Sequence, residues 1–433
     1  MAEHSGRTVH DLRRESRTAV LQRLYFDGPM SRYSLVPATG LSSGSVSKVV
    51  TELITDGLVE EAGSIDSRRG RPRILVRIAP GGGHLIGVDV GETRVLVELF
   101  DLCLTELARA ERPLERRNGR PHDVGVIVRH INDSIAEVVR SSGVDGDTLL
   151  GVGIGVPGII DGGAEGGVVV HSQTIGRQAV PLEKLLRDTG RPAHRVPYFI
   201  DNGAKTLGQA EMWFGAGRGA RSAVVVLFGS GVSACVVTDD VERGRAVEWG
   251  HLTVQVRGRR CRCGASGCLE AYAGADALLA RWREAGGRAS AGADEESALV
   301  ELLSGAYPKD GRAPDPVAAT VLAETAEYLG AGLADLINLF QPERILVGGW
   351  AGLRLGPPFL QAVRTQARAH ALRHPASSVS IELGRLGPDA VTVGAATLPL
   401  ADFFAHGGRR PHPTDRPTPL PPWQASLSRR LAH

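Results

Sequence analysis

A histidine and three cysteines lie close together between positions 251 and 268. They are His251, Cys261, Cys263 and Cys268, and the glycines between the cysteines would let the loop fold back on itself. One imidazole and three thiolates form the tetrahedral ligand set of structural zinc sites. Because four protein ligands leave no open coordination position for water, we expect a structural zinc ion here rather than a catalytic one.

Three arginines, Arg259, Arg260 and Arg262, flank these thiols. Positive charges beside a thiol favour the thiolate that binds metal, so we expect them to lower the cysteine pKa values. The alternative is a set of free thiols without metal. Five cysteines among 433 residues are too few for a disulfide scaffold, and a reducing compartment would keep them as thiols.

Three helical patterns open the chain. The first spans residues 8–27, the second runs from Ser31 to Gly40, and the third begins with Ser42 as its N-cap and ends at Gly57. A strand, an arginine-rich turn and a second strand follow up to residue 80. Three short helices and such a hairpin predict a winged helix-turn-helix, whose third helix lies in the major groove of DNA.

The polar face of the third helix and the tip of the hairpin supply the predicted DNA contacts. These residues are Ser43, Ser45, Ser47 and Lys48 in the helix and Arg69 and Arg71 in the wing. The alternative is an ordinary amphipathic helix beside a solvated loop. Pro37 lies inside the second helix, where we expect it to kink or shorten that helix.

Charge is distributed unevenly along the chain. The formal net charge is only +2, which excludes a strongly basic coat for nucleic acid. Residues 1–80 carry +3 and residues 408–433 carry +4, which leaves −5 between them. No apolar run is long enough for a membrane span, and the first residues lack the apolar segment of a signal peptide, so we expect a cytoplasmic protein.

After Gly81-Gly82-Gly83, which reads as a short linker, apolar strands alternate with helices. Residues 85–101, 151–161, 223–237 and 344–349 are the predicted strands and their turns. Helices are predicted at residues 124–141, 203–214, 274–285 and 316–339. This alternation is typical of α/β layers with covered sheets. The last residues are rich in proline and arginine without periodicity, and we expect them to be disordered.

Eight segments resemble, in order, those of the ROK family of sugar kinases and sugar-responsive repressors. They are LIGVDVGETRVLVELFD, GVGIGVPGIID, FIDNGAKTLGQAEMWFGAGRG, LFGSGVSACVV, VEWGHLTV, CRCGASGCLEAY, ERILVGG and VTVGAA. The similarity runs from about residue 84 to 400, and the segment CxCGxxGCxE is close to diagnostic of the family. Repressors of this family also resemble residues 8–80, including the GRP sequence of the wing.

The resemblance implies an actin-like (ribonuclease H-like) ATPase fold, with two α/β lobes and a sugar cleft between them. The expected divisions are 1–80 for the DNA-binding domain, 84–200 plus 388–405 for the smaller lobe, 201–387 for the larger lobe with the zinc site, and 406–433 for the disordered tail. It also implies a homodimer or homotetramer.

The catalytic apparatus of the related sugar kinases is altered in this chain. Their general base is an aspartate in a segment of the form E-N-D-A-N, and the alignment places Gly203 at that position. A residue without a side chain cannot accept a proton. Glu92 stands in the first phosphate loop, which is usually D-x-G-G-T, and the second loop has lost its last glycines. We therefore expect no catalytic residues and no kinase activity.

The sugar-contacting positions are retained. By resemblance, Asn202, Glu248, His251 and Glu270 fall on residues that hydrogen-bond sugar hydroxyls or brace the loops that do so. Carboxylate and amide groups can pair with vicinal hydroxyls. The alternatives are that Glu248 caps a turn, that His251 serves only as a zinc ligand, and that Glu270 is a surface helix residue.

These features predict a sugar-responsive transcriptional regulator, and more specifically a repressor of carbohydrate uptake or metabolism. Its expected partners are double-stranded operator DNA, a monosaccharide or amino-sugar effector, and further copies of itself. Two alternatives remain open: an active ATP-dependent sugar kinase with an appended DNA-binding domain, and a ROK regulator without a sugar effector.

Overall fold

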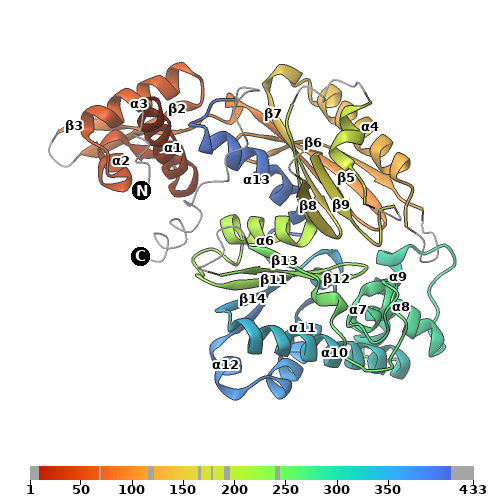
Figure 1. Ribbon diagram of the computed structural model, residues 1–433. Coiled ribbons are helices and arrows are strands. Elements are labelled where there is room, and N and C mark those ends of the chain that lie inside the picture. The colour runs from red at the N-terminus through yellow and green to blue at the C-terminus, as the bar shows by residue number, and fades with distance from the viewer. Residues whose placement is uncertain are drawn as a thin grey trace, which may run out of the picture.

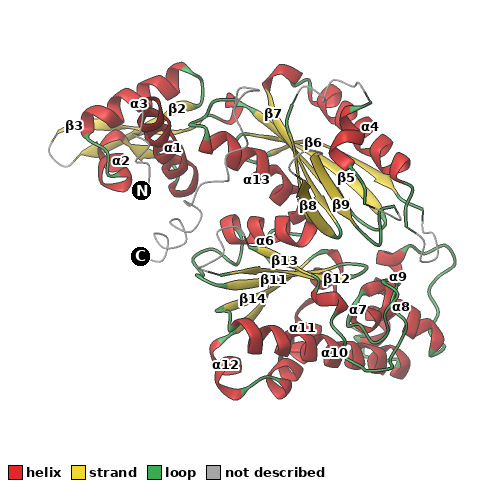
Figure 2. Cartoon of the chain, in the orientation of Figure 1, coloured by secondary structure: helices red, strands yellow, loops and turns green. Residues whose placement is uncertain are grey.

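The computed structural model describes residues 9–67, 70–115, 121–163, 167–176, 179–189, 196–238 and 244–410. These residues form a mixed α/β structure with a small helical domain beside two larger α/β lobes (Figure 1). Helices cover the sheets of both lobes (Figure 2). The α/β class and the two-lobed, actin-like arrangement expected from the sequence are confirmed.

The N-terminal domain is a winged helix-turn-helix. Helices α1 (Val9–Asp27), α2 (Arg32–Thr39) and α3 (Ser43–Thr55) precede the wing strands β2 (Val59–Ser67) and β3 (Gly70–Ile78), and the short strand β1 (Met30–Ser31) pairs with β3. Ser42 accepts a hydrogen bond from the amide of Ser45, as an N-cap does. Helix α2 continues through Pro37 to Thr39, and Gly40 caps it, so the kink or shortening expected at this proline is not observed.

The smaller lobe has a five-stranded sheet in the order β10-β7-β4-β5-β6. Its strands are β4 (His84–Val90), β5 (Arg94–Asp101), β6 (Glu106–Pro113), β7 (Leu149–Val156) and β10 (Tyr198–Asn202), and β8 (Ile159–Gly163) pairs with β9 (Gly167–His171) beside it. Helix α4 (Val124–Ser142) packs on β5 and β6, and α5 (Leu182–Arg187) packs on β9. Short 3-10 turns lie at Pro80–Gly82 and Gly146–Thr148.

The larger lobe has a second five-stranded sheet, in the order β13-β12-β11-β14-β15. Its strands are β11 (Ala223–Phe228), β12 (Val232–Val237), β13 (Arg245–Val247), β14 (Arg344–Gly348) and β15 (Ser380–Leu383). The helices around it are α7 (Glu270–Ala273), α8 (Ala275–Glu284), α9 (Glu295–Ala306), α10 (Pro316–Phe340), α11 (Trp350–His370) and α12 (Arg373–Ser378). A 3-10 turn, Trp249–His251, leads into the cysteine loop.

Two helices connect the lobes with the N-terminal domain. Helix α6 (Gly203–Phe214) packs on β11 and on β7, and α13 (Ala390–Ala405) packs on α6, β4 and β7. Glycine permits this close approach, because a Cβ at Gly153 would lie 1.8 Å from the carbonyl oxygen of Ala395. Figure 1 shows α13 between the N-terminal domain and the smaller lobe's sheet.

The three glycines predicted as a linker form a packed junction instead. A Cβ at Gly83 would lie 2.7 Å from a methyl carbon of Leu150, and one at Gly82 would lie 2.9 Å from the carbonyl oxygen of Gly57. One hydrophobic core also continues from α1 and α3 into the smaller lobe and α13, through residues such as Phe100 and Phe404. The DNA-binding domain is therefore held against the lobe rather than tethered to it.

Part of the predicted tail contacts the N-terminal domain. Residues 411–433 lie outside the described residues, but 406–410 are described, and the buried Arg17 donates a 2.6 Å hydrogen bond from Nε to the carbonyl oxygen of Gly407. Arg17 also lies 2.7 Å from Asp56 of the same domain. No helix in the described ranges is both long enough and apolar enough to cross a membrane.

Candidate effector cleft and metal centre

A cavity of about 580 Å³ lies between the two lobes. The smaller lobe contributes residues 89–94, 156–159 and 171–174, and the larger lobe contributes 229–233, 248, 251, 262, 263 and 270. The first residues of α6 and Val391 of α13 also line it. Its walls combine apolar surface with a few polar groups, which is typical of a small-molecule site.

The four residues predicted to contact sugar all line this cavity. They are Asn202, Glu248, His251 and Glu270, which come from separate segments of the chain. Asn202 is buried and caps α6: its Oδ1 accepts from the amide of Ala204 at 2.8 Å, while its Nδ2 donates to Gly158. Its side chain therefore braces the cavity wall. Contact of all four with a sugar stays a prediction.

The histidine and the three cysteines converge beside the cavity. The ligand atoms of His251, Cys261, Cys263 and Cys268 lie within 4.8 Å of one another. The sulfur atoms of Cys263 and Cys268 are 3.7 Å apart, and Nδ1 of His251 is 3.7 Å from the sulfur of Cys261. Ligands bound to zinc at ~2.3 Å in a tetrahedron are roughly 3.8 Å apart. The group can therefore hold a metal ion.

The expected effect of the arginines on the thiols is wrong for two of the cysteines. Burial raises the pKa of Cys261 to about 12 and also raises the pKa of Cys268. The pKa of Cys263 is lowered, because hydrogen bonds to its sulfur outweigh burial. Arg259 pairs with Glu284 at 2.7 Å, and Arg262 pairs with carboxylates in the cavity. Their charges are thus neutralised by partners other than the thiols.

His251 joins the metal centre to the cavity. Its Nδ1 faces the thiol of Cys261, while its Nε2 lies 3.9 Å from a carboxylate oxygen of Glu248. A metal-bound histidine whose second nitrogen faces a carboxylate has its tautomer and orientation fixed by that partner. A metal ion here would therefore also orient a cavity residue.

Gly203 is the first residue of α6 and lines the cavity without offering a side chain. The neighbouring Asp201 does not replace a missing base, because its carboxylate lies 2.5 Å from Nζ of Lys205 and accepts from the amide of Asn202. Asp89 does line the cavity, and burial raises its pKa to about 6 despite the nearby Arg94.

An ion-pair triad that sequence reasoning missed crosses the cavity. Glu92, in the turn between β4 and β5, pairs with both terminal nitrogens of Arg262 at 2.5 Å. Arg262 lies between two cysteines of the other lobe, and it also donates to both oxygens of Glu270. The signal in the sequence is Glu92 itself, since a partly buried carboxylate in a glycine turn requires a counter-charge.

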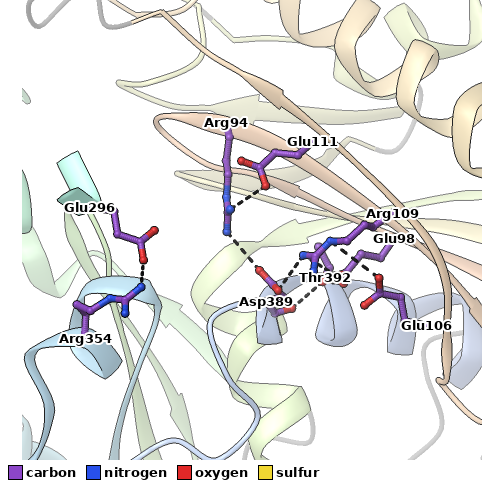
Figure 3. Close-up of polar contacts among 9 residues, drawn as sticks. All are labelled: Arg94, Glu98, Glu106, Arg109, Glu111, Glu296, Arg354, Asp389 and Thr392. Carbon is purple, nitrogen blue, oxygen red and sulfur yellow. Dashed lines mark hydrogen bonds and ion pairs between the residues drawn. The ribbon is translucent and has the colours of Figure 1, made fainter. Parts of the chain in front are cut away.

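A second polar network anchors the start of α13 (Figure 3). Asp389 accepts from Arg94 at 3.2 Å and from Arg109 at 2.8 Å, so two strands of the smaller lobe hold this residue. Glu98 lies beneath the helix, is only 2% exposed, and accepts a hydrogen bond from Thr392. Figure 3 also shows Arg354 paired with Glu296 in the larger lobe.

Replacement of Glu98 by glutamine is expected to flatten the pH dependence of stability. Burial raises the pKa of Glu98 to about 7, although Thr392 opposes the shift. The folded protein therefore binds this proton more tightly than the unfolded chain, and the resulting stability is present below pH 4.5 and lost as the pH rises through 7. The loss amounts to at most about 3 kcal/mol.

Urea unfolding of Glu98→Gln between pH 4.5 and 8 measures this effect. Glu106→Gln is the matched control: both glutamates pair with Arg109, Glu98 at 3.1 Å and Glu106 at 3.9 Å, but the Glu106 side chain is 42% exposed. An unchanged pH slope in Glu98→Gln would contradict the assignment.

The predicted DNA-contacting residues of α3 share one exposed face. Ser43, Ser45, Ser47 and Lys48 are exposed, whereas Val46 and the other apolar residues of the helix are buried in the domain. Arg69 lies outside the described residues, and Arg71 lies in β3 but its side chain is not described. The guanidinium of Arg73, further along the wing, stacks 4.1 Å from the ring of Tyr33. Arg73, which belongs to the arginine-rich wing expected to reach DNA, and Tyr33 are further candidate contacts, and sequence reasoning missed Tyr33.

The fold and the cleft together define a winged helix-turn-helix joined to a two-lobed domain of the sugar-kinase type. The ROK family pattern matches residues 85–401, and the chain belongs to the ROK family.

Both regulators and kinases of this family resemble the chain. The xylose repressor of Caldicellulosiruptor bescii is 27% identical over 403 residues, which cover 91% of this chain and 97% of that protein. The glucokinase of Halalkalibacterium halodurans is 29% identical over 330 residues, covering 72% of this chain and 94% of the kinase.

A solved structure also shares the complete architecture. The crystal structure of a ROK family transcriptional regulator, described as a homologue of the Escherichia coli Mlc protein, aligns with a TM-score of 0.70 and 22% identity. It covers 92% of this chain and 98% of that one. At this identity the likeness supports the fold.

Proposed function

We propose that this protein is a transcriptional repressor whose operator affinity is changed by a sugar bound in the interlobe cavity. The observation that carries the proposal is that two helices, α6 and α13, start at the cavity and end against α1 of the DNA-binding domain. Repressor relatives matched along almost their whole length support the same function.

Helix α6 provides the first connection. Asn202 and Gly203 at its start line the cavity, and Trp213 near its end packs edge-on against Phe26 of α1 with ring centroids 5.1 Å apart. Twelve helical residues span about 18 Å, so movement of the cavity wall reaches α1 through one rigid element.

Helix α13 provides the second connection. Val391 in its first turn lines the cavity. Phe404 at its end packs against Tyr25 of α1, with the ring centroids 5.2 Å apart. Thr18 of α1 donates a 2.7 Å hydrogen bond to the carbonyl oxygen of Phe404. A sugar that favours one arrangement of the lobes would therefore also favour one position of the DNA-binding domain. A coupling of about 1–3 kcal/mol changes operator affinity roughly 5- to 150-fold.

The metal is proposed to be a structural zinc ion, held by His251, Cys261, Cys263 and Cys268. Two buried thiols and an imidazole at tetrahedral spacing suit zinc, and the closed ligand set supplies no reactive position. When bound, the ion would hold the cysteine loop and the ring of His251 against the cavity.

The cavity is proposed to bind its sugar without phosphorylating it. Gly203 offers no base, Asp201 is engaged by Lys205, and Glu92 places a carboxylate in the first glycine turn. A purified protein that turns over ATP with any sugar would establish the kinase alternative instead.

In the proposed complex, a dimer presents two α3 helices to successive major grooves about 34 Å apart. Ser43, Ser45, Ser47 and Lys48 face the groove, while Arg69 and Arg71 reach the flanking phosphates or minor groove. The net charge of +3 on residues 1–80 favours this approach.

Titration of a panel of monosaccharides and amino sugars into the protein–operator complex tests the proposal. We expect at least one sugar to change operator affinity by fivefold or more, measured by fluorescence anisotropy, and to bind the protein in calorimetry. Operator binding that no sugar alters would overturn the sensor function and leave a regulator without a sugar effector.

The variant Glu248→Gln should weaken the sugar response, because it removes a cavity carboxylate. The matched control is Glu137→Gln, which changes a half-buried glutamate paired with Arg112 outside the cavity lining. Equal responses of the two variants would contradict the placement of the sugar.

A further inference from the structure

The lining of the cavity contains more carboxyl groups than guanidinium groups. Among the described residues that line it, four bear carboxyl groups, Asp89, Glu92, Glu248 and Glu270, and two bear guanidinium groups, Arg94 and Arg262. Carboxylates therefore outnumber guanidinium cations in the lining. A ligand that carries further negative charge would enter an unfavourable potential.

Both arginines are already paired with carboxylates of the protein. Arg94 is bonded to Glu111 at 2.9 Å and to Asp389 at 3.2 Å. The hydrogen bonds of Arg262 use its Nε and both terminal nitrogens, with Glu92 on one side and Glu270 on the other. Four of the five N–H groups that a guanidinium carries thus donate hydrogen bonds to carboxylates.

The triad is also built into the wall of the cavity. The Glu270 side chain is only 10% exposed and accepts a further hydrogen bond from the amide of Val232. A Cβ at Gly231 would lie 2.2 Å from a Glu270 oxygen and 2.4 Å from a terminal nitrogen of Arg262. The second glycine turn is therefore filled by this ion pair, so its backbone is covered on that side.

We propose that the Glu92–Arg262–Glu270 triad makes the cavity selective for uncharged sugars and excludes their phosphorylated forms. The inference rests on the proposed sugar-sensing function and names the class of effector. Glu92 is the selecting residue, because its carboxylate both occupies the arginine that would otherwise receive a phosphate and repels the phosphate's own charge. Hydroxyl groups are neutral donors and acceptors, so they tolerate this surface.

Calorimetry with matched ligand pairs tests the proposal on the full-length protein. The probes are glucose and glucose 6-phosphate, mannose and mannose 6-phosphate, and N-acetylglucosamine and its 6-phosphate. For whichever pair binds, we expect the free sugar to bind at least tenfold more tightly than its phosphate. In Glu92→Gln the ratio of free-sugar affinity to phosphate affinity should fall about tenfold, through tighter binding of the phosphate.

The control variant is again Glu137→Gln, which should retain the selectivity of the native protein. A second measurement uses the native protein alone. Raising the salt concentration from 0.05 to 0.5 M should reduce the difference in affinity between the free sugar and its phosphate, because salt screens charge repulsion. If salt leaves this difference in affinity unchanged, charge repulsion is not the cause of the selectivity and the proposal is overturned.

The remaining outcomes separate this inference from the proposed function. A sugar phosphate that binds as tightly as its free sugar overturns the selectivity but confirms a sugar sensor. Selectivity that Glu92→Gln leaves intact overturns the role of the triad. Binding of neither member of any pair overturns both the inference and the sensor.

Discussion

Replacement of Cys268 by serine is expected to cost the protein its metal ion and several kcal/mol of stability in the larger lobe. The cysteine loop contains no regular helix or strand: isolated bridges, Thr253 with Cys268 and Arg260 with Ser266, and single backbone hydrogen bonds join its segments. Structural zinc contributes on the order of 10 kcal/mol in small metal-bound domains, and we expect the ion pairs of Arg259 and Arg262 to offset only part of its loss.

The loss should extend to sugar binding. The loop carries Arg262, and His251 before it presents Nε2 toward Glu248. A loop that loses its metal releases both residues from the cavity wall. We therefore expect a lower melting temperature, loss of bound zinc and at least tenfold weaker sugar binding.

Metal analysis, thermal unfolding with and without a chelator, and calorimetry measure these three effects. Cys103→Ser is the matched control, since Cys103 is an exposed thiol outside the cluster. A Cys268→Ser protein that retains one zinc ion per chain and the native melting temperature would contradict the assignment of the metal centre.

Reversal of the charge of Lys48 is expected to weaken operator binding by about 30-fold or more, or ~2 kcal/mol. Lys48 is exposed on the face of α3 that is proposed to enter the major groove. Lys48→Glu removes a phosphate contact and adds repulsion from the backbone, so the slope of log affinity against log salt should become shallower by at least about 0.9.

Lys309→Glu makes the same change of charge on an exposed residue of the larger lobe and serves as the control. Both variants are compared by fluorescence anisotropy on the same operator fragment at several salt concentrations. Equal affinities of the two variants would show that the basic side chain of α3 does not meet DNA.

The sequence was a good guide where function depends on local pattern. The four candidate metal ligands lie between residues 251 and 268, so their types and spacing were sufficient to predict that they converge. The sequence also predicted helix α3 and its start, because Val46 and the other apolar residues recur at helical spacing and Ser42 caps the helix.

The prediction of a linker at residues 81–83 was wrong, because it considered only the residue types of this segment. Glycine permits flexibility, but it also permits close packing, and only the neighbours of the residue decide between the two. Here Leu150, which is distant in sequence, lies against Gly83. The same reasoning applies to Arg259 and Arg262, whose effect on the thiols depended on carboxylates from other segments.

By itself, the sequence determined the α/β class, the winged helix-turn-helix, the four candidate metal ligands and the loss of a side chain at Gly203, because each depends on residue types at short or fixed spacing. Only the tertiary structure showed which of these parts are in contact with one another. Glu92 and Arg262 meet from opposite lobes, and α6 and α13 bring the cavity wall to α1. Contacts between residues more than a hundred positions apart follow from how the sheets and helices pack, and no local pattern encodes them.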